Sequence, residues 1–599
     1  MVENNSRIGI FCLLLCHNVY TIYINQTGVI CMNIIIRECD EKVANRIAKE
    51  HKININIVKF LLGRNVPEDM IPLLVSNELL PLLSNDTLTN VDKCADVIDR
   101  YINDNDAHIY IFGDYDSDGI NATYIMYNAL KELIDALESS AKIDYYIPER
   151  FEGYGLNKKW CESILDDNSN KLVITVDNGI TKKAEIDFLQ ENGVEVLVTD
   201  HHEPQQGLVP NTIVVDAHYN NDDFNSKSLC GAAVAYKVVA FLYQDIYEYD
   251  FLYLEKYIPH VAIATITDMM KVSEENIRFV NNGLYYINKY PYDNMEYSPV
   301  SEAMYFFAEN NKGTKTTAKD IAFNLGPQIN SCGRMNDVNA AIKFMLADDE
   351  EEILENYRTM LDLNDKRKDL TNTISACIEP PKTTEVALVR KIAGAEGIIG
   401  NIANSLCSAY GLPTIIFTET EGNILSGSAR CSNVYSLMEL FKNTNYIYSF
   451  GGHDQAAGIS ILKKDYDKFV KSFNKAVSKA PVMARATVEE MVYVDQKIQA
   501  TDINKYFINK YDDVLFFNEF QKPVYYLENA QIVGYHTSKN NENNICFHIK
   551  AGNKVIKVWS WKFTETYKQL GEPKLVNLVC GLEIFNGMNV MDIYNIEVA

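Results

Sequence analysis

Carboxylate and imidazole side chains follow three strand-like runs in the first half of the chain. The runs are HIYIF, KLVITV and VEVLVT, and the side chains are Asp114, Asp116, Asp118, Asp177, Asp200, His201 and His202. Carboxylates that meet in a buried place repel one another unless they bind protons or a cation. Oxygen ligands mixed with imidazole suit Mn²⁺ or Mg²⁺ better than Zn²⁺. So large a set favours two ions about 3.5–4 Å apart, the arrangement that activates a water for attack at phosphorus.

Each motif also has an ordinary structural explanation. Asp is common in loops and at the first position of helices, so Asp118 could simply cap a helix that begins near Ile120. Three such motifs, each at the end of a predicted strand in one series, favour a metal site over that explanation.

Strands and helices alternate between residues 108 and 216. We expect β-strands over residues 108–112, 142–148, 171–177, 194–200 and 212–216. Helices of ordinary length between them indicate βαβ units and a parallel sheet, so the fold class is α/β. Ligands of open parallel sheets bind outside the carboxyl ends of the strands, and the acidic and imidazole groups are therefore expected to converge on one rim.

The rest of the chain divides into further domains by its pattern. A second α/β pattern contains the turn FGGHDQAAG, and mostly strands follow from about residue 490, which suggests a small barrel or sandwich. The predicted domains are a separate N-terminal extension (1–31), a helical lead-in with the catalytic domain (32–345), a long connecting helix (346–380), a smaller α/β domain (381–485) and a β-rich, OB-like domain (486–599).

Composition limits the classes of function. The chain carries 56 Lys and Arg against 81 Asp and Glu, a formal net charge of −25, which argues against coating nucleic acid through bulk charge. The acidic balance does not exclude nucleic-acid binding through a local basic groove or through metal ions that bridge to phosphate. The 13 cysteines form no CxxC pair, which argues against a zinc ribbon and fits a reducing compartment. The apolar run at residues 8–16 is too short to span a membrane, so we expect a cytoplasmic protein.

Three aromatic residues alternate in the β-rich region: Trp559, Trp561 and Phe563. In one strand they would share a face. That face could belong to the core or to a surface on which bases stack, and the sequence leaves both open.

The metal motifs resemble those of a known family. GDYDSDG, VDNGI and TDHHEP, in this order, resemble motifs I to III of the DHH phosphoesterases, and in particular the RecJ branch, the 5′→3′ single-strand DNA exonucleases. IATITDMM supplies Asp268 in the place of the motif IV aspartate, and LGPQINSCGRMND resembles the GPRxNAAGR segment, with Gln328 where an Arg is usual. GIIGNIANSL, SGSAR and GGHDQAAG resemble the DHHA1 domain. The resemblance covers residues 32–480 and weakens beyond, where RecJ proteins have an OB-fold.

The resemblance implies roles for the matching residues. The implied metal ligands are Asp114, Asp116, Asp118, Asp177, His201 and Asp268. The implied catalytic residues are Asp118, Asp177, His201 and His202. Asp200 would orient a histidine. The implied nucleic-acid-binding residues are Arg334, Arg430, Gly451, Gly452 and His453, the arginines because their planar forks suit phosphate.

The family further implies an activity. It is metal-dependent hydrolysis of single-stranded DNA, 5′→3′, to 5′-mononucleotides, with two divalent ions, Mn²⁺ or alternatively Mg²⁺, in recombination, repair or replication. It implies a monomer without membrane contact, and a single-strand-binding protein or a helicase as partner. Two alternatives stay open. One is a phosphodiesterase for cyclic dinucleotides or short RNA, which usually lacks the C-terminal strands. The other is a non-catalytic replication scaffold, which the intact metal motifs disfavour.

Overall fold

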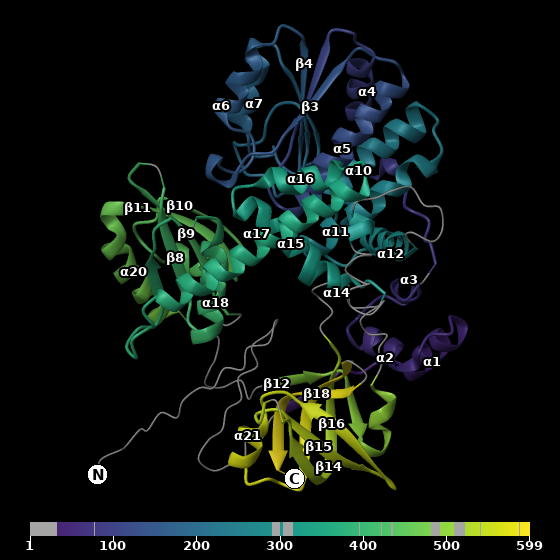
Figure 1. The fold of residues 1–599 in the computed structure, drawn as a ribbon, viewed down its shortest axis with the longest axis vertical. Helices are drawn as coiled ribbons and strands as arrows, with labels where there is room; N and C mark the ends of the chain where they lie inside the picture. The colour runs from purple at the N-terminus through teal and green to yellow at the C-terminus, as the bar shows by residue number, and fades with distance from the viewer. Residues whose placement is uncertain are drawn as a thin grey trace. The chain divides into compact units, whose positions relative to one another are not determined.

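The computed structural model describes residues 33–76, 78–289, 300–303, 315–394, 396–420, 422–432, 435–480, 491–507, 522–539, 541–585 and 588–598. Figure 1 shows the course of the chain. Among the described residues, one compact unit is formed by those from 72 to 369, and a second by those from 33 to 71 together with those from 370 to 507 and from 522 to 598. The predicted N-terminal extension, residues 1–31, lies outside the described residues.

The unit of residues 72–369 is built on a five-stranded parallel sheet. Its strands are β2 (Ala107–Phe112), β3 (Lys142–Tyr146), β4 (Asn170–Val176), β5 (Glu195–Thr199) and β6 (Ile213–Val215). All five predicted strands are confirmed. The spatial order is β3-β2-β4-β5-β6, so the chain runs from β2 to one side and then returns to β4 on the other. The direction of winding reverses between β2 and β4, and the carboxyl end of such a pair is where ligands bind.

Helices cover both faces of this sheet. They and the other helices of the unit are α4 (Val91–Ile102), α5 (Ser117–Ala136), α6 (Lys158–Ser163), α7 (Lys183–Glu191), α8 (Ala217–Asn220), α9 (Phe224–Lys227), α10 (Gly231–Phe241), α11 (Ile258–Thr267), α12 (Glu274–Lys289), α14 (Ala318–Asp320), α15 (Gly326–Arg334) and α16 (Val338–Leu346). Figure 1 shows α6 and α7 on one side of the strands and α4 and α5 on the other. Because both faces are covered, the strands read as continuous apolar runs.

The smaller α/β domain follows the long helix α17 (Glu350–Cys377), which ends shortly before Pro380 and Pro381, residues that cannot continue a helix. Its elements are β7 (Leu388–Lys391), α18 (Ile399–Tyr410), β8 (Thr414–Glu419), β9 (Ile424–Arg430), α19 (Leu437–Lys442), β10 (Ser449–Gly452), β11 (Ala456–Leu462) and α20 (Tyr466–Lys479). The sheet order is β10-β11-β9-β8-β7, mixed parallel and antiparallel. One apolar cluster joins the sheet to α19 and α20, and another joins it to α18.

Five C-terminal strands close into a barrel. They are β14 (Val524–Thr537), β15 (Ile545–Ala551), β16 (Lys554–Ser560), β17 (Leu575–Phe585) and β18 (Met588–Val598), with helix α21 (Thr564–Gln569). Two strands precede them: β13 (Gln496–Gln499) pairs with β14, and β12 (Met491–Val494) belongs to a separate two-stranded sheet. Closure follows because β14 pairs with both β15 and β17, while β18 joins β17 to β16. The expected α/β fold with a β-rich C-terminal domain is confirmed.

The N-terminal segment is held to the C-terminal strands. β1 (Asn33–Ile36) pairs in parallel with β12. After α1 (Glu41–Glu50) and α2 (Ile55–Gly63), the guanidinium of Arg64 donates two hydrogen bonds to Asp495, at 2.9 and 2.8 Å. The short helix α3 (Met70–Leu74) then leads into the parallel-sheet unit. The domain boundaries stated from the sequence stay predictions.

The alternating aromatic residues do not share one face. β16 ends at Ser560, and Phe563 is buried in the barrel core. Trp559 and Trp561 are half-buried and stack on each other, with ring centroids 6.1 Å apart. The expectation of a common face is therefore wrong for Phe563, because the strand is shorter than the alternation.

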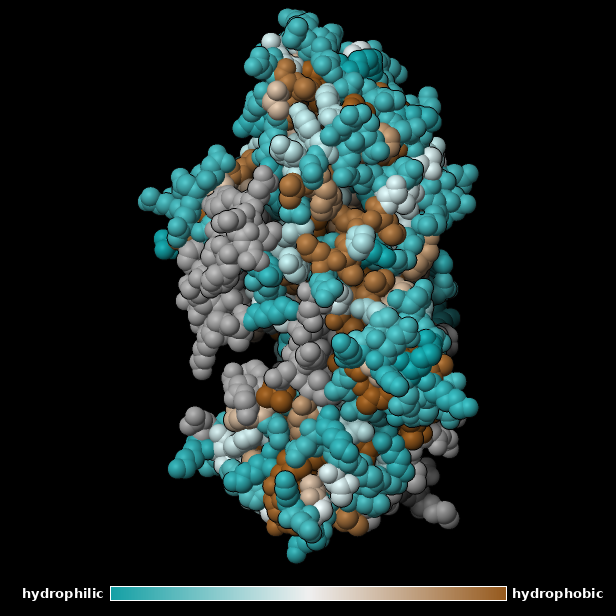
Figure 2. Space-filling view, turned by 90° about the vertical axis from the view of Figure 1, so that its right-hand side faces the viewer, coloured by the Kyte–Doolittle hydropathy of each residue, from teal (hydrophilic) through white to brown (hydrophobic). Residues whose placement is uncertain are grey.

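No helix in the described ranges is long and apolar enough to cross a membrane. Hydrophilic residues predominate on the face shown in Figure 2.

Candidate metal centre

The first acidic motif forms the turn between β2 and α5. Asp116 is the N-cap of α5, because its side chain accepts hydrogen bonds from the backbone N–H groups of Asp118 (3.0 Å) and Gly119 (3.1 Å). Glycine is required at position 119, since a Cβ there would lie 2.5 Å from the carbonyl oxygen of Asp114. The suggestion that Asp118 caps a helix near Ile120 is therefore wrong, and its carboxylate serves another purpose.

Asp118 is anchored by the first turn of α10. Its two carboxylate oxygens accept hydrogen bonds of 2.7 Å from the backbone N–H groups of Gly231 and Ala232, at the positive end of that helix. Burial, and then the charge of Asp116, raise the pKa of Asp118 to about 6 in spite of these bonds. A Cβ on Gly231 would lie 2.5 Å from the Cβ of Asp177. The small residues that begin α10 therefore let the two aspartates meet.

Asp177 follows β4 with a left-handed φ of 60°, which Asp and Asn adopt more readily than most residues. Its Oδ1 is buried without a hydrogen-bond partner among the described residues. That atom lies 3.1 Å from Nε2 of His201, in poor alignment for a hydrogen bond. Burial, and then the charges of Asp118 and Asp116, raise the pKa of Asp177 well above its usual range. A cation would stabilise such a carboxylate.

His201, after β5, points its Nε2 at three carboxylates. Besides Asp177, it lies 3.6 Å from Oδ2 of Asp118 and 3.9 Å from Oδ2 of Asp268, the residue directly after α11. Burial, and then the charge of His202, lower the pKa of His201 to about 3. The ring is therefore neutral near pH 7, as a metal ligand must be.

Three overlapping groups of side chains are placed to hold metal ions. They are Asp118–His201–Asp268, Asp177–His201–His202 and Asp114–Asp116–Asp177, and the ligand atoms of each group lie within 4.8 Å of one another. Asp177 belongs to two groups, so neighbouring ions would share its carboxylate. His201 also belongs to two groups, but Nε2 has one lone pair and would bind only one of the ions. Asp114 adds a second buried carboxylate oxygen without a hydrogen-bond partner in the described structure. The donors fit Mn²⁺ or Mg²⁺.

Asp200 lies behind the cluster and orients His202, as expected. Its Oδ1 is 2.7 Å from Nδ1 of His202, and its Oδ2 accepts a hydrogen bond of 2.9 Å from the backbone N–H of Ile180. Burial lowers the pKa of His202, but the hydrogen bond and charge of Asp200 outweigh it and raise that pKa to about 9. In the metal-free protein His202 is therefore protonated near pH 7, and in that state it cannot act as a metal ligand. Tyr154 lies beside it, 3.3 Å from the ring nitrogens, and sequence reasoning missed this residue.

Replacing Asp200 by Asn should shift the pH dependence of hydrolysis. Without the carboxylate, the pKa of His202 falls and the ring loses its proton near pH 7. If the protonated ring contacts the scissile phosphate, the rate of Asp200→Asn drops about 10- to 100-fold at pH 8 and recovers towards pH 6. A pH–rate profile at saturating Mn²⁺ checks this. A uniform loss at every pH would instead assign Asp200 a structural role.

Helix α15 supports the acidic turn. Oδ1 of Asn330 accepts a hydrogen bond of 2.8 Å from the backbone N–H of Ser117, and a Cβ on Gly333 would collide with the carbonyl oxygen of Tyr115. Arg334 follows at the end of the helix, half-buried, where its charge acts on Tyr115. The predicted phosphate-binding arginine therefore lies beside the acidic turn, while its role stays a prediction.

The remaining predicted residues lie together in the smaller α/β domain. Arg430 at the end of β9 pairs with Ala456 on β11, whose carbonyl accepts a hydrogen bond of 2.8 Å from the backbone N–H of the exposed His453. Gly452 has φ 129°, and a Cβ there would lie 2.7 Å from that carbonyl oxygen. Gly451 is exposed, with open space around a Cβ. Arg430 and His453 therefore lie at the same end of this sheet.

Two segments of the chain match known protein families. Residues 108–265, which carry the parallel sheet and most of the cluster, match the DHH family, N-terminal domain. Residues 385–479 match the DHHA1 domain. The chain is a DHH–DHHA1 phosphoesterase. The DHH part comprises β2 to β6 with the helices between them, then α8 to α10 and most of α11. The DHHA1 part comprises β7 to β11 with α18 to α20.

This DHH–DHHA1 phosphoesterase is similar to RecJ proteins along much of its length. It is 27% identical over 419 residues to the single-stranded-DNA-specific exonuclease RecJ of Haemophilus influenzae, covering 66% of this chain and 70% of that protein. The crystal structure of RecJ from Thermus thermophilus in complex with Mn²⁺ shares its fold, with a TM-score of 0.73 at 22% identity over 94% of this chain and 78% of that chain. A crystal structure of exonuclease RecJ bound to manganese matches with a TM-score of 0.54 at 27% identity, over 69% of this chain and 99% of that chain.

Proposed function

We propose that this protein is an exonuclease that degrades single-stranded DNA from the 5′ end and releases 5′-mononucleotides. The observation that carries the proposal is the meeting of Asp118, Asp177 and His201 at the switch point of the parallel sheet. Similar proteins are named single-stranded-DNA-specific exonucleases. The proposal includes a monomer that works beside a single-strand-binding protein or a helicase.

The cofactors in this proposal are two divalent ions, Mn²⁺ or alternatively Mg²⁺. When bound, they supply water activation and charge stabilisation at phosphorus. Asp118, fixed through both oxygens by α10, and neutral His201 with Asp268 would hold one ion. Asp114 and Asp116 would hold the other, and Asp177, which belongs to two of the three groups, would be shared.

Cationic side chains orient the substrate in this proposal. His202, kept protonated by Asp200, donates a hydrogen bond to an oxygen of the scissile phosphate. Arg334 pairs with a flanking phosphate as a planar fork. In the DHHA1 domain, Arg430 and His453 bind the strand, and Gly451 and Gly452 let its backbone approach closely.

Labelled single strands test the proposal. Oligodeoxynucleotides labelled at the 5′ or the 3′ end are incubated with Mn²⁺ or with a chelator, and the products are resolved by size. We expect the 5′ label to appear first as a mononucleotide, no cleavage of blunt duplex, and no cleavage with chelator. Cleavage restricted to dinucleotides and very short RNA would contradict the proposal in favour of the phosphodiesterase alternative.

Replacing Arg430 by Ala should weaken substrate binding more than turnover. Its Nη1 already donates hydrogen bonds to Oγ of Ser428 (2.9 Å) and to the carbonyl of Ala429 (2.8 Å), which hold the guanidinium in place. We expect KM for a long single strand to rise about 10-fold or more, the loss of a charge-assisted hydrogen bond, with kcat nearly unchanged. Steady-state kinetics measure both constants.

Lys442→Ala is the matched control for this prediction. Lys442 forms an exposed ion pair with Glu439 in the same domain, so its replacement also removes one positive charge. It should change KM by less than about twofold. If both replacements raised KM equally, Arg430 would contribute only through its positive charge and not through a specific contact with phosphate.

A further inference from the structure

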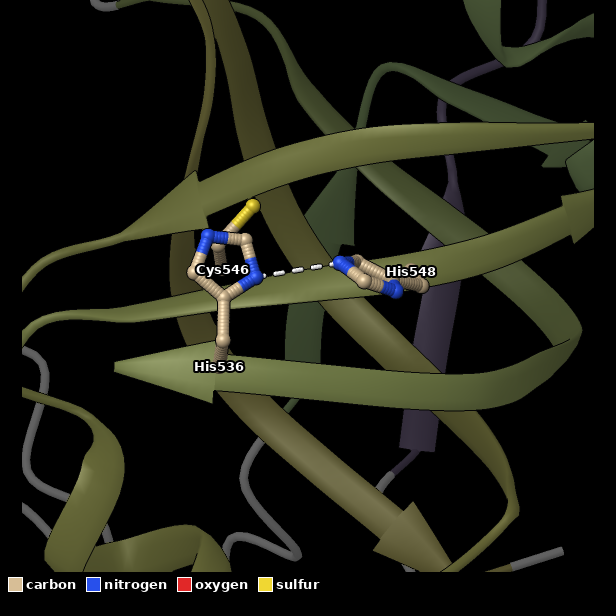
Figure 3. A group of neighbouring side chains, drawn as sticks. All are labelled: His536, Cys546 and His548. Carbon is tan, nitrogen blue, oxygen red and sulfur yellow. Dashed lines mark hydrogen bonds between the residues drawn. The ribbon is translucent and has the colours of Figure 1, made fainter. Parts of the chain in front are cut away.

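A second cluster of metal-binding side chains lies on the C-terminal barrel, outside the DHH and DHHA1 domains. It consists of His536 on β14 and of Cys546 and His548 on β15. Their ligand atoms lie within 4.8 Å of one another. Figure 3 shows the two imidazoles facing each other, with Nδ1 of His536 and Nε2 of His548 3.1 Å apart.

Strand register explains why the three side chains meet. His536 pairs directly with Cys546 across the antiparallel β14–β15 ladder, and His548 follows two positions along β15. Residues two apart in a strand share a face, and directly paired residues share it too. The alternate residues of β15, Ile545 and Phe547, lie in the barrel core. The cluster therefore lies on the outer face of the barrel wall.

The neighbours of the cluster cover its sulfur. Cys546 is 1% exposed although it lies on the outer face. Trp559 pairs with Cys546 from β16, and its ring lies 5.4 Å from that of His536. His536 itself is exposed, which leaves one side of the cluster open to solvent. A buried thiol beside one exposed and one half-buried imidazole is a ligand arrangement that an ion can enter from the solvent side.

We propose that His536, Cys546 and His548 bind one Zn²⁺ ion, with a solvent molecule as the fourth ligand. Zn²⁺ takes thiolate and imidazole ligands in tetrahedral geometry, and Zn–N bonds of about 2.0–2.1 Å put two nitrogens about 3.3 Å apart. The separation of the two imidazole nitrogens is close to that value. Because thiolate and imidazole select Zn²⁺ over Mn²⁺ or Mg²⁺, this site differs in chemistry from the acidic cluster of the DHH domain.

The electrostatics of the cluster are compatible with metal binding. Burial, and then the charges of His536 and Lys557, lower the pKa of His548, so its ring is neutral near pH 7. Burial raises the pKa of the Cys546 thiol, while Lys557 opposes the rise. The ion would displace the thiol proton on binding, as zinc does at other cysteine sites. It would also tie β14 to β15 beside the stacked Trp559.

Titration of the full-length protein with Co²⁺, a spectroscopic substitute for Zn²⁺, tests this site. Thiolate bound to Co²⁺ gives a ligand-to-metal charge-transfer band in the near ultraviolet. We expect about one thiolate-bound Co²⁺ per chain, displaced by Zn²⁺ but not by Mg²⁺. Cys546→Ser should abolish the band, and His548→Ala should weaken Co²⁺ binding by at least about tenfold. No band in the wild-type protein would overturn the proposal.

Control variants identify the thiolate that binds. Cys377→Ser removes an exposed cysteine from α17 and should leave the band unchanged. Asp177→Asn should also leave it unchanged, because the site is independent of the acidic cluster and of the nuclease proposal. His536→Ala alters only an exposed side chain, so it tests the site even if Cys546→Ser folds poorly, and it should weaken binding as His548→Ala does. A band that survives Cys546→Ser, or disappears in Asp177→Asn, contradicts the proposed site.

Discussion

Replacing Asp177 by Asn should abolish hydrolysis while making the metal-free protein more stable. Asp177 is the carboxylate common to two of the metal-binding groups, and its Oδ1 lacks a hydrogen-bond partner in the described structure. Asn keeps the shape and accepts the left-handed φ of 60° at this position. Because the charge that holds the ions is lost, kcat/KM for single-stranded DNA should fall at least about 10³-fold, about 4 kcal/mol of transition-state stabilisation.

The gain in stability follows from the same charge. In the metal-free protein, burial and the charges of neighbouring aspartates disfavour ionised Asp177. Its removal should raise the free energy of unfolding at pH 8 by about 1 kcal/mol or more, since one pKa unit corresponds to about 1.4 kcal/mol. Asp187→Asn, which removes a half-buried surface carboxylate paired with Lys183 on α7, is the control and should alter neither quantity appreciably. An active Asp177→Asn, or one less stable without metal, would contradict the assigned role.

Raising the pH should destabilise metal-free wild-type protein relative to Asp177→Asn, and Mn²⁺ should reverse the effect. The folded pKa of Asp118, about 6, lies above the ordinary value of about 3.9 for an unfolded chain. The folded protein therefore binds the Asp118 proton more tightly than the unfolded chain does. The stabilisation that results is fully present below about pH 4 and is lost as the pH rises through 6. The pKa values of Asp114, Asp177 and Asp268 are raised in the same direction and extend the loss to higher pH.

The comparison with the variant is needed because buried histidines act in the opposite direction. Burial lowers the pKa of His201 and of His260 to about 3, so their contribution to stability falls as the pH decreases below 6.5. The contribution of His260, which contacts Asn121 and not Asp177, cancels in the difference between the two proteins. The stability difference between the wild type and Asp177→Asn is measured from unfolding midpoints between pH 5 and 8, once with chelator and once with Mn²⁺. Saturating Mn²⁺ at about 1,000 times its Kd should stabilise the wild type by about 4 kcal/mol. A difference independent of pH would contradict repulsion among ionised carboxylates.

The sequence predicts the parallel sheet and the convergence of the metal ligands well, for a physical reason. Strands buried on both faces are continuous apolar runs, and the residues after them must lie at the carboxyl edge of the sheet. Asp114, Asp177 and His201 could be placed together from this rule alone. The DHH and DHHA1 architecture follows from the motifs, and the fold confirms it.

Details that depend on tertiary contacts could not be predicted. The backbone N–H groups that hold Asp118 belong to Gly231 and Ala232, more than a hundred positions later. The sequence around Asp118 contains no pattern that predicts this contact. Tyr154 reaches His202 from a loop whose sequence has no metal-binding character. His536, Cys546 and His548 meet only because of the register between β14 and β15, which hydrophobic alternation does not determine for a closed barrel.

Counting bound Mn²⁺ tests the central claim, that distant acidic and imidazole residues meet around divalent cations at one edge of the sheet. Free Mn²⁺ is measured by electron paramagnetic resonance while the metal-free protein is titrated, in parallel with hydrolysis of a labelled single strand. The account predicts about two bound ions per wild-type chain, with activity rising as they bind, and loss of both in Asp177→Asn. Full hydrolysis without bound metal, or unchanged Mn²⁺ binding in Asp177→Asn, would contradict it.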